Sequence, residues 1–407
     1  MSRLIPVVFV LLFSASAVRA DDWPGWRGPA GTGITNETDL PVSWSATDNV
    51  RWKISLEGAG VSSPVVVGER VFLTASDGRF NDQLHVTCYD RSKGELLWHV
   101  KLFGSAVSEG QYAPGGMAVP TPAADAKRLY ALFGTGDLVC LDHDGKPVWM
   151  RSLAQEYGPF RNRWGMAASP MLVGELLVVQ VDHWGESYLL GIDAATGANR
   201  WRTVREASVN WTSPLAVTVK GRTQIVAAGT YKVKGYDAKD GSELWSVQGL
   251  EMQCIPSPVT EGEMIYAVSG RNSFNLAIRL DTQRGDLTKS HLAWKAKAGA
   301  TYVPSPVCYQ GLYYYVEDTG IATCLDARTG KLMWRERLNG QFHASLLAGD
   351  GKVYFTSMEG TVSVVQAGRS FKLLSQNDMG EAIMASLSVS RGEFFIRSDK
   401  HLYCIRR

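Results

Sequence analysis

Short apolar runs alternate with polar turns along most of the chain. Runs such as 65–67, 71–74 and 85–87 are rich in valine and other strand-favouring residues and are separated by glycine turns. Their length and composition predict β-strands rather than helices. We therefore expect one all-β domain over residues 49–407, preceded by an N-terminal extension over residues 21–48.

A repeated signature divides this domain into equivalent units. An aspartate is followed four residues later by a glycine and then by a tryptophan, as in Asp326, Gly330 and Trp334. Glycine supplies the positive φ of a tight turn, the aspartate accepts bonds from turn amides, and tryptophan offers a large surface for packing between units. We assign to this structural repeat Gly94, Gly197, Gly241 and Gly330, with Trp52, Trp98, Trp149, Trp201, Trp245, Trp294 and Trp334.

Each unit also opens with Ser-Pro or a near variant. The two signatures together define four strands per unit, at a period of about 47 residues. Four-stranded units repeated at this period are typical of a β-propeller. The openings are at Ser63, Thr121, Ser169, Ser213, Ser257, Ser305, Ser345 and Ser386.

The two ends of the repeat pattern complement each other. Trp52 lies in a strand with no earlier partners of its own, whereas the last unit stops after its third strand near Tyr403. We predict that the N-terminal strand completes the C-terminal blade, because this would pair two open sheet edges. The ring then has eight blades; seven is the alternative, because the seventh unit is degenerate.

The segment 325–334, which reads LDARTGKLMW, resembles the repeat of the pyrroloquinoline-quinone-like (PQQ-like) propellers. That superfamily includes quinoprotein alcohol dehydrogenases and the outer-membrane assembly propeller lipoprotein. Residues 23–33 resemble the start of an exported group of mostly uncharacterised members. The resemblance implies the propeller fold and, for the dehydrogenases, a bound quinone with Ca²⁺. This chain departs from both relatives, since it has neither the adjacent cysteines common beside the quinone nor a cysteine for lipid attachment in residues 1–20.

Residues 1–20 have the three-part form of a secretory signal: Arg3, an apolar stretch, and small residues up to Ala20. We expect cleavage after Ala20 and a periplasmic or secreted monomer with no transmembrane span; an uncleaved N-terminal anchor is the alternative. The formal net charge is only +2 and Lys/Arg runs are lacking, which argues against nucleic acid as a partner.

The six cysteines do not read as a disulfide framework. Four of them occupy the same place in different repeats, as Cys88 and Cys324 do. Equivalent places lie a repeat width apart, which exceeds the roughly 7 Å that a disulfide tolerates. We expect buried packing residues instead.

Candidate chemistry falls at one end of the predicted ring. The loops between units and the turns between second and third strands must emerge together, around the mouth of the central channel, where ligands of closed propellers bind. There a cation would neutralise an anionic ligand and an aromatic ring would stack on it. The ligand-binding candidates are Arg163, Trp164, Asp182, His183, Asn210, Trp211, Lys232, Arg271, Tyr302, His343 and Glu381.

The leading functional prediction is an exported, non-catalytic propeller that binds a protein or envelope component through the mouth face. No catalytic residue and no metal site are assigned, because no acid/base pair or ligand spacing is fixed by the sequence. One alternative is a PQQ-dependent oxidoreductase, with Asp182, Asn210 or Glu381 offering oxygens to Ca²⁺. Another is a carbohydrate-binding propeller, since exposed tryptophans stack on sugars.

Overall fold

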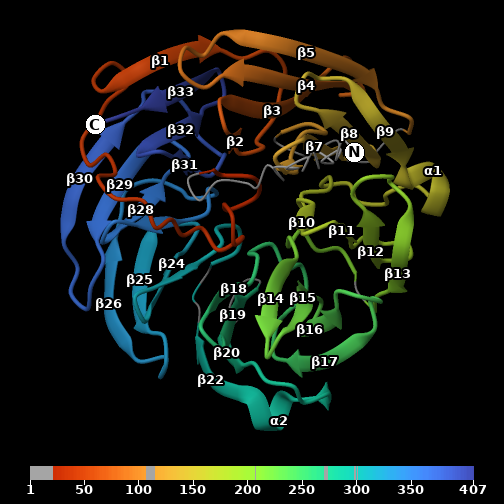
Figure 1. Ribbon diagram of the computed structural model, residues 1–407. Coiled ribbons are helices and arrows are strands. Elements are labelled where there is room, and N and C mark those ends of the chain that lie inside the picture. Colours follow the sequence, from red (N-terminus) through yellow and green to blue (C-terminus); the bar gives the residue numbers. More distant parts are fainter. Residues whose placement is uncertain (1–21, 107–114, 207, 270–273, 298, 300) are drawn as a thin grey trace, which may run out of the picture.

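The computed structural model describes residues 22–106, 115–206, 208–269, 274–297, 299 and 301–407. Within these residues, eight antiparallel sheets form the blades of a ring around a central axis (Figure 1). The predicted all-β, eight-bladed propeller is thus confirmed, and the seven-bladed alternative is wrong. No helix in the described part is long and apolar enough to cross a membrane.

Seven of the blades follow chain order from the inner to the outer strand. Blades 1 and 2 consist of β2 (Val65–Val67), β3 (Arg70–Asp77), β4 (Gln83–Asp90) and β5 (Leu96–Phe103), then β6 (Ala123–Ala124), β7 (Arg128–Leu132), β8 (Asp137–Asp142) and β9 (Pro147–Ser152). Blades 3 and 4 consist of β10 (Met171–Val173), β11 (Leu176–Val181), β12 (Tyr188–Asp193) and β13 (Asn199–Val204), then β14 (Leu215–Val219), β15 (Arg222–Gly229), β16 (Lys232–Asp237), β17 (Glu243–Gln248) and the added β21 (Gly285–Asp286).

The second half of the ring repeats this order. Blades 5 and 6 consist of β18 (Val259–Glu261), β19 (Met264–Val268), β20 (Phe274–Arg279) and β22 (Leu292–Lys297), then β23 (Val307–Tyr309), β24 (Leu312–Val316), β25 (Ile321–Asp326) and β26 (Leu332–Arg337). Blade 7 consists of β27 (Leu347–Gly349), β28 (Lys352–Thr356), β29 (Thr361–Gln366) and β30 (Leu373–Asp378). Two short helices, α1 (Leu153–Tyr157) and α2 (Thr288–His291), lie on connections.

Blade 8 joins the two ends of the domain. Its inner strands are β31 (Ser388–Ser390), β32 (Glu393–Arg397) and β33 (His401–Ile405), and its outer strand is β1 (Val50–Ser55). β1 runs antiparallel to β33, with Trp52 opposite Cys404 and Lys53 opposite Tyr403. The predicted closure of the ring by the N-terminal strand is therefore confirmed.

Repeat tryptophans connect six of the eight blades to the next blade within the described part of the chain. Trp52 of blade 8 donates from Nε1 to the Arg91 carbonyl of blade 1 at 2.9 Å, and its ring covers Gly94 of the same turn. A side chain at that glycine would collide with the indole, so the glycine of one repeat fits the tryptophan of the previous one. The equivalent Nε1 bonds run from Trp98 to His143, Trp149 to Ala194, Trp201 to Ala238, Trp294 to Ala327 and Trp334 to Gly368.

Blade 4 departs from this scheme. Trp245 donates to Oε1 of Gln224 in its own blade at 2.7 Å. The insertion in the following repeat places β21 parallel to β17, with Gly285 opposite Trp245. No heavy atom lies within 4 Å of a Cβ built on Gly285.

This difference predicts unequal effects of Gly→Ala changes at two equivalent turn positions. Both glycines have positive φ, +70° at Gly330 and +89° at Gly285, so alanine is strained at either one. A Cβ at Gly330 would also lie 2.8 Å from the Trp294 ring. We expect Gly330→Ala to lower the free energy of unfolding by about 1–3 kcal/mol more than Gly285→Ala, measured by urea denaturation. Equal losses would mean that the tryptophan contact contributes nothing.

All six cysteines are free and buried, five of them in strands and Cys254 on the loop between blades 4 and 5. Burial raises the pKa of the Cys88 and Cys404 thiols to about 12, so these groups stay protonated at neutral pH. They act as small packing residues, in agreement with the sequence analysis.

Candidate functional site

A ring of hydroxyl groups surrounds the channel at the start of the innermost strands. In seven of the eight openings among the described residues, the backbone N–H of the Ser or Thr donates to the hydroxyl oxygen of the next blade, as from Ser169 to Ser213 at 2.9 Å; the series ends at Ser386, and the Ser63 hydroxyl has no partner there. The O–H hydrogen takes no part in this bond. The other bonds run from Ser63 to Thr121, Thr121 to Ser169, Ser213 to Ser257, Ser257 to Ser305, Ser305 to Ser345 and Ser345 to Ser386.

Above this ring lies a cavity of about 760 Å³, which we call the cup. It occupies the end of the channel where the loops between blades emerge. Six hydroxyls of the ring line it, together with apolar side chains such as Val61 and Val119. Its volume falls in the range of pockets that hold small ligands or a few side chains.

The N-terminal extension closes the floor of the cup. In Figure 1 this red segment begins inside the ring and then passes outward to β1. It contacts the innermost parts of several blades: Trp23 forms a bridge with Val66, and Ile34 forms one with Ala348. Between these points the Trp26 side chain lines the cup and donates from Nε1 to the Ser257 hydroxyl at 3.3 Å.

Arg27 anchors the same segment below the cup. Its side chain is buried and bonds through Nη2 to the carbonyls of Pro306 and Leu346. Burial lowers the pKa of this guanidinium to about 9, which still leaves it charged at neutral pH. The extension is thus held to blades 6 and 7 by a buried cation.

Five of the predicted ligand-binding residues line the cup. Arg163 lies over the Trp164 ring, 5.2 Å from its centroid, and Trp164 is 45% exposed. Trp211 is buried and donates from Nε1 to the Gly165 carbonyl at 2.8 Å. These three residues join Tyr302 and His343 around one opening.

Tyr302 and His343 are the other two predicted residues that line the cup. The Tyr302 hydroxyl donates to Oε1 of Gln253 at 3.1 Å, which fixes the ring at the wall of the cup. Burial lowers the pKa of His343, so this imidazole is neutral at pH 7. The wall is therefore aromatic and largely uncharged, with Arg163 and Glu251 as its ionic side chains.

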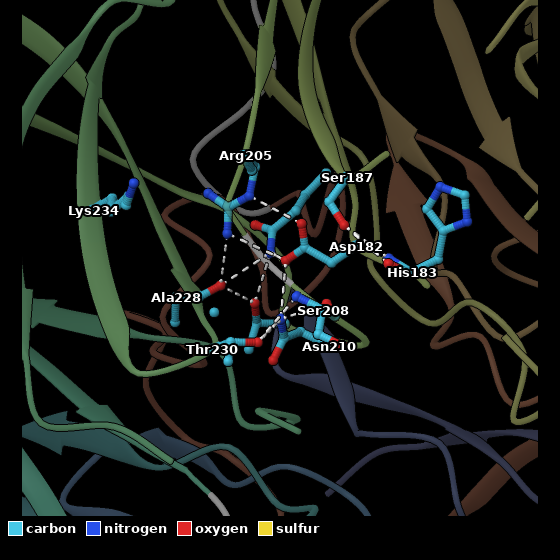
Figure 2. Close-up of polar contacts among 12 residues, drawn as sticks. Asp182, His183, Ser187, Arg205, Ser208, Asn210, Ala228, Thr230 and Lys234 are labelled. Atoms are coloured by element: carbon cyan, nitrogen blue, oxygen red, sulfur yellow. Dashed lines mark hydrogen bonds and ion pairs between the residues drawn. The ribbon is translucent and has the colours of Figure 1, made fainter. Parts of the chain in front are cut away.

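Asp182, His183 and Asn210 are buried and do not line the cup: Asp182 and Asn210 lie between blades 3 and 4, and the His183 ring packs against Phe160 and accepts from the Arg161 N–H. Figure 2 shows Asp182 and Arg205 facing each other, with Asn210 beside them and the His183 ring turned away. Arg205 Nε lies 2.9 Å from Asp182 Oδ1, and Asn210 Nδ2 lies 3.4 Å from Oδ2. Burial alone would lower the pKa of Arg205, but the adjacent Asp182 charge raises it above its ordinary value.

The other three predicted residues are dispersed. Lys232 lies at a turn of blade 4 away from the cup. Glu381 contacts Lys53 and His401 of blade 8; burial raises its pKa, but hydrogen bonds, led by that from Ser398, outweigh burial and lower it to about 2. Arg271 lies outside the described residues.

The lining of the cup does not fit a quinone held with Ca²⁺. Ca²⁺ takes six to eight oxygen ligands, mostly from several carboxylates and carbonyls. Among the described residues that line the cup, Glu251 carries the sole carboxylate. Asp182 binds Arg205 and Glu381 binds blade 8, and no group of three His, Cys, Asp or Glu in the described part has the arrangement of a metal site. We therefore derive no step through that cofactor.

Fold and site together define a class of protein: an eight-bladed propeller whose channel is closed at one end to form an aromatic cup. The chain belongs to the family described as outer membrane protein assembly factor BamB, whose model matches residues 33–158, 82–319 and 286–369. This family match confirms the resemblance to the PQQ-like propellers.

Two relatives match most of the chain. BamB of Burkholderia pseudomallei is 25% identical over 311 residues, which cover 73% of this chain and 69% of that protein. Tetrathionate hydrolase of Acidithiobacillus ferrooxidans is 24% identical over 352 residues, which cover 76% of this chain. The chain spans only 65% of the hydrolase's length.

Solved structures with the same fold include a BamB and two dehydrogenases. BamB of Moraxella catarrhalis aligns with a TM-score of 0.65 at 14% identity, covering 88% of this chain and 97% of that one. A europium-containing methanol dehydrogenase aligns with a TM-score of 0.73 at 11% identity, covering 96% and 98%. Quinohemoprotein alcohol dehydrogenase of Comamonas testosteroni aligns with a TM-score of 0.73 at 14% identity. The alignment covers 96% of this chain and 81% of that one.

Two features of the cup were not predicted from the sequence. Trp26 forms the floor, yet residues 23–33 indicated only a family resemblance. The sequence does contain an indication of this role, because two tryptophans and an arginine stand close together in the glycine-rich stretch of residues 23–33. The residues of the hydroxyl ring are those of the Ser-Pro openings. In the sequence, these openings indicate where strands begin, but they do not indicate the hydrogen bonds between blades.

Proposed function

We propose that this protein is a non-catalytic scaffold that holds a segment of a partner protein in the cup, in the assembly of outer-membrane proteins. The family description and the Burkholderia pseudomallei relative support the assembly role. An exported location belongs to the same proposal and rests on the signal-like sequence of residues 1–20, which lie outside the described part.

The observation that carries the proposal is a group of exposed apolar side chains at the mouth end of the ring. All of them lie on loops between blades or on turns between second and third strands, and each is about half exposed. Aromatic residues and methionine are enriched in protein interfaces, and soluble proteins seldom expose many of them together. They are Phe80 (61% exposed), Trp164 (45%), Trp184 (51%), Tyr231 (50%) and Met252 (56%).

The cup indicates the chemistry of the bound segment. Trp26, Trp211 and Tyr302 form an aromatic wall that suits one or two apolar side chains. The ring hydroxyls retain O–H groups that can donate to backbone carbonyls of an extended peptide. Arg163 at the mouth adds a charged donor.

Replacing two mouth residues tests this proposal. We expect Trp164→Glu combined with Met252→Glu to weaken partner binding at least tenfold, because both exposed side chains would lose apolar contact on docking. A photo-crosslinking amino acid at position 252 should give a discrete adduct with a component of outer-membrane protein assembly in cells that make this protein.

The matched control is Leu332, which is 53% exposed on the outer strand β26, away from the mouth. Leu332→Glu should leave binding unchanged, and a crosslinker at position 332 should give no such adduct. Equal crosslinking from both positions would contradict the proposal. So would reproducible alcohol oxidation by the purified protein with added quinone and Ca²⁺, since that would make it an enzyme.

A further inference from the structure

A second cavity lies at the seam where the ring closes. Its volume is about 290 Å³, and it lies between β1 of blade 8 and strands β3, β4 and β5 of blade 1. We call it the seam cavity. Its polar lining includes Arg397, Thr74, His85 and His99, with Glu57 at the exposed rim.

Among the residues that the structure describes, the buried Arg397 guanidinium has no carboxylate partner. The side chain is 3% exposed, and Nη1 donates to the Ser62 carbonyl at 3.1 Å, the Ser62 hydroxyl at 2.6 Å and the Thr74 carbonyl at 2.9 Å. All three acceptors are neutral. Among the described residues, Arg397 Nε has no acceptor and Thr74 Oγ1 has no partner. The cavity therefore has two buried N–H or O–H donors to spare.

The other buried arginines differ from Arg397 either in having a carboxylate partner or in lying away from a cavity. Within the described part, four arginines are more than nine-tenths buried, and Arg91 and Arg205 pair with Glu393 and Asp182. Arg27 and Arg397 donate hydrogen bonds to neutral oxygens. Of these two, Arg397 lines a cavity, and Arg27 lines neither the cup nor the seam cavity. Burying a cation without a counter-charge is costly, so a site that keeps one beside an open volume favours an anion.

A pair of histidines also lines the seam cavity. His85 Nδ1 and His99 Nε2 are 2.8 Å apart, and Asp77 Oδ1 lies 2.9 Å from His85 Nε2. One proton lies between the two facing nitrogens, because a hydrogen bond needs one donor and one acceptor. An anion in the cavity would stabilise further protonation of this pair.

We propose that the seam cavity binds a small monocarboxylate, whose oxygens accept from Arg397 Nε and the Thr74 hydroxyl. Hydrogen bonds from a guanidinium to a carboxylate are charge-assisted and strong in a buried place. Glu57 at the rim disfavours ligands with more than one negative charge. The site is separate from the cup and does not depend on the proposed scaffold function.

The test is a titration of the purified full chain with sodium acetate, at an ionic strength held constant with NaCl. The ¹⁵N signals of the imidazoles report binding. We expect saturable shifts of His85 and His99 at millimolar acetate, lost in Arg397→Gln and retained in Arg335→Gln, whose guanidinium is 54% exposed. Thr74→Val should weaken binding about tenfold, because one hydrogen bond to a charged group is removed.

Each other outcome would overturn the proposal. Shifts that never saturate, or that persist in Arg397→Gln, would mean that the guanidinium holds no anion. Sulfate that binds as tightly as acetate would contradict the carboxylate assignment. If Arg397→Gln fails to fold, Thr74→Val decides, and unchanged acetate affinity in that variant would refute the site.

Discussion

Replacing Asp182 by alanine is expected to lower the free energy of unfolding by about 3–5 kcal/mol. Asp182 and Arg205 form a buried ion pair between blades 3 and 4, with side chains 1% and 3% exposed. Removal of the carboxylate leaves the guanidinium buried with only neutral neighbours, such as the Ala228 carbonyl and the Tyr236 hydroxyl. Chemical denaturation of the two proteins measures the difference.

Two further variants test whether the loss of stability comes from leaving a buried charge without its partner. Asp144→Ala removes the partner of Arg70 at the surface, where the carboxylate is 72% exposed, and should change stability by less than about 1 kcal/mol. Asp182→Leu combined with Arg205→Met removes both charges and should be more stable than Asp182→Ala. A loss below about 1 kcal/mol in Asp182→Ala would show that water replaces the carboxylate.

Replacing Trp52 by alanine is expected to cost about 3–5 kcal/mol and to loosen the closure of the ring. The indole is buried between blades 8 and 1, where it covers Gly94, lies 6.0 Å from the Phe395 ring and bonds to the Arg91 carbonyl. Alanine would leave a void at the seam where two distant chain segments meet. Hydrogen exchange of the β33 amides should therefore accelerate more than that of β15 in blade 4, on the far side of the ring.

Trp184 provides the control for Trp52. It is 51% exposed on a turn of blade 3, so Trp184→Ala should change the free energy of unfolding by less than about 1 kcal/mol and leave exchange in β33 unaltered. Comparable losses in the two variants would show that the seam does not depend on the Trp52 contact.

The fold followed from the sequence because each blade repeats one physical solution. A glycine such as Gly94 must accommodate the indole of the previous blade, so glycine and tryptophan recur together and reveal the period. Closure was predictable for the same reason, since Trp52 had no unit of its own. The exception at Trp245 was less visible, because the insertion that changes its contacts lies in the following repeat.

The site could be predicted only in part. Repeat position correctly places Arg163, Trp164 and Trp211 at the mouth, but it does not determine whether a side chain enters the cavity. Asp182 follows a strand just as an exposed loop residue would, and its burial depends on Arg205, which stands 23 residues later. Trp26 belongs to no repeat, so periodicity gives it no position.

The floor made by the extension also has a kinetic consequence. Because the extension bonds to the innermost parts of blades 1 and 7 and Trp26 lines the cup, we expect a bound segment to enter and leave at the mouth, past Trp164 and Met252. Variants at these two rim positions should then alter dissociation rates even where contacts deep in the cup stay the same.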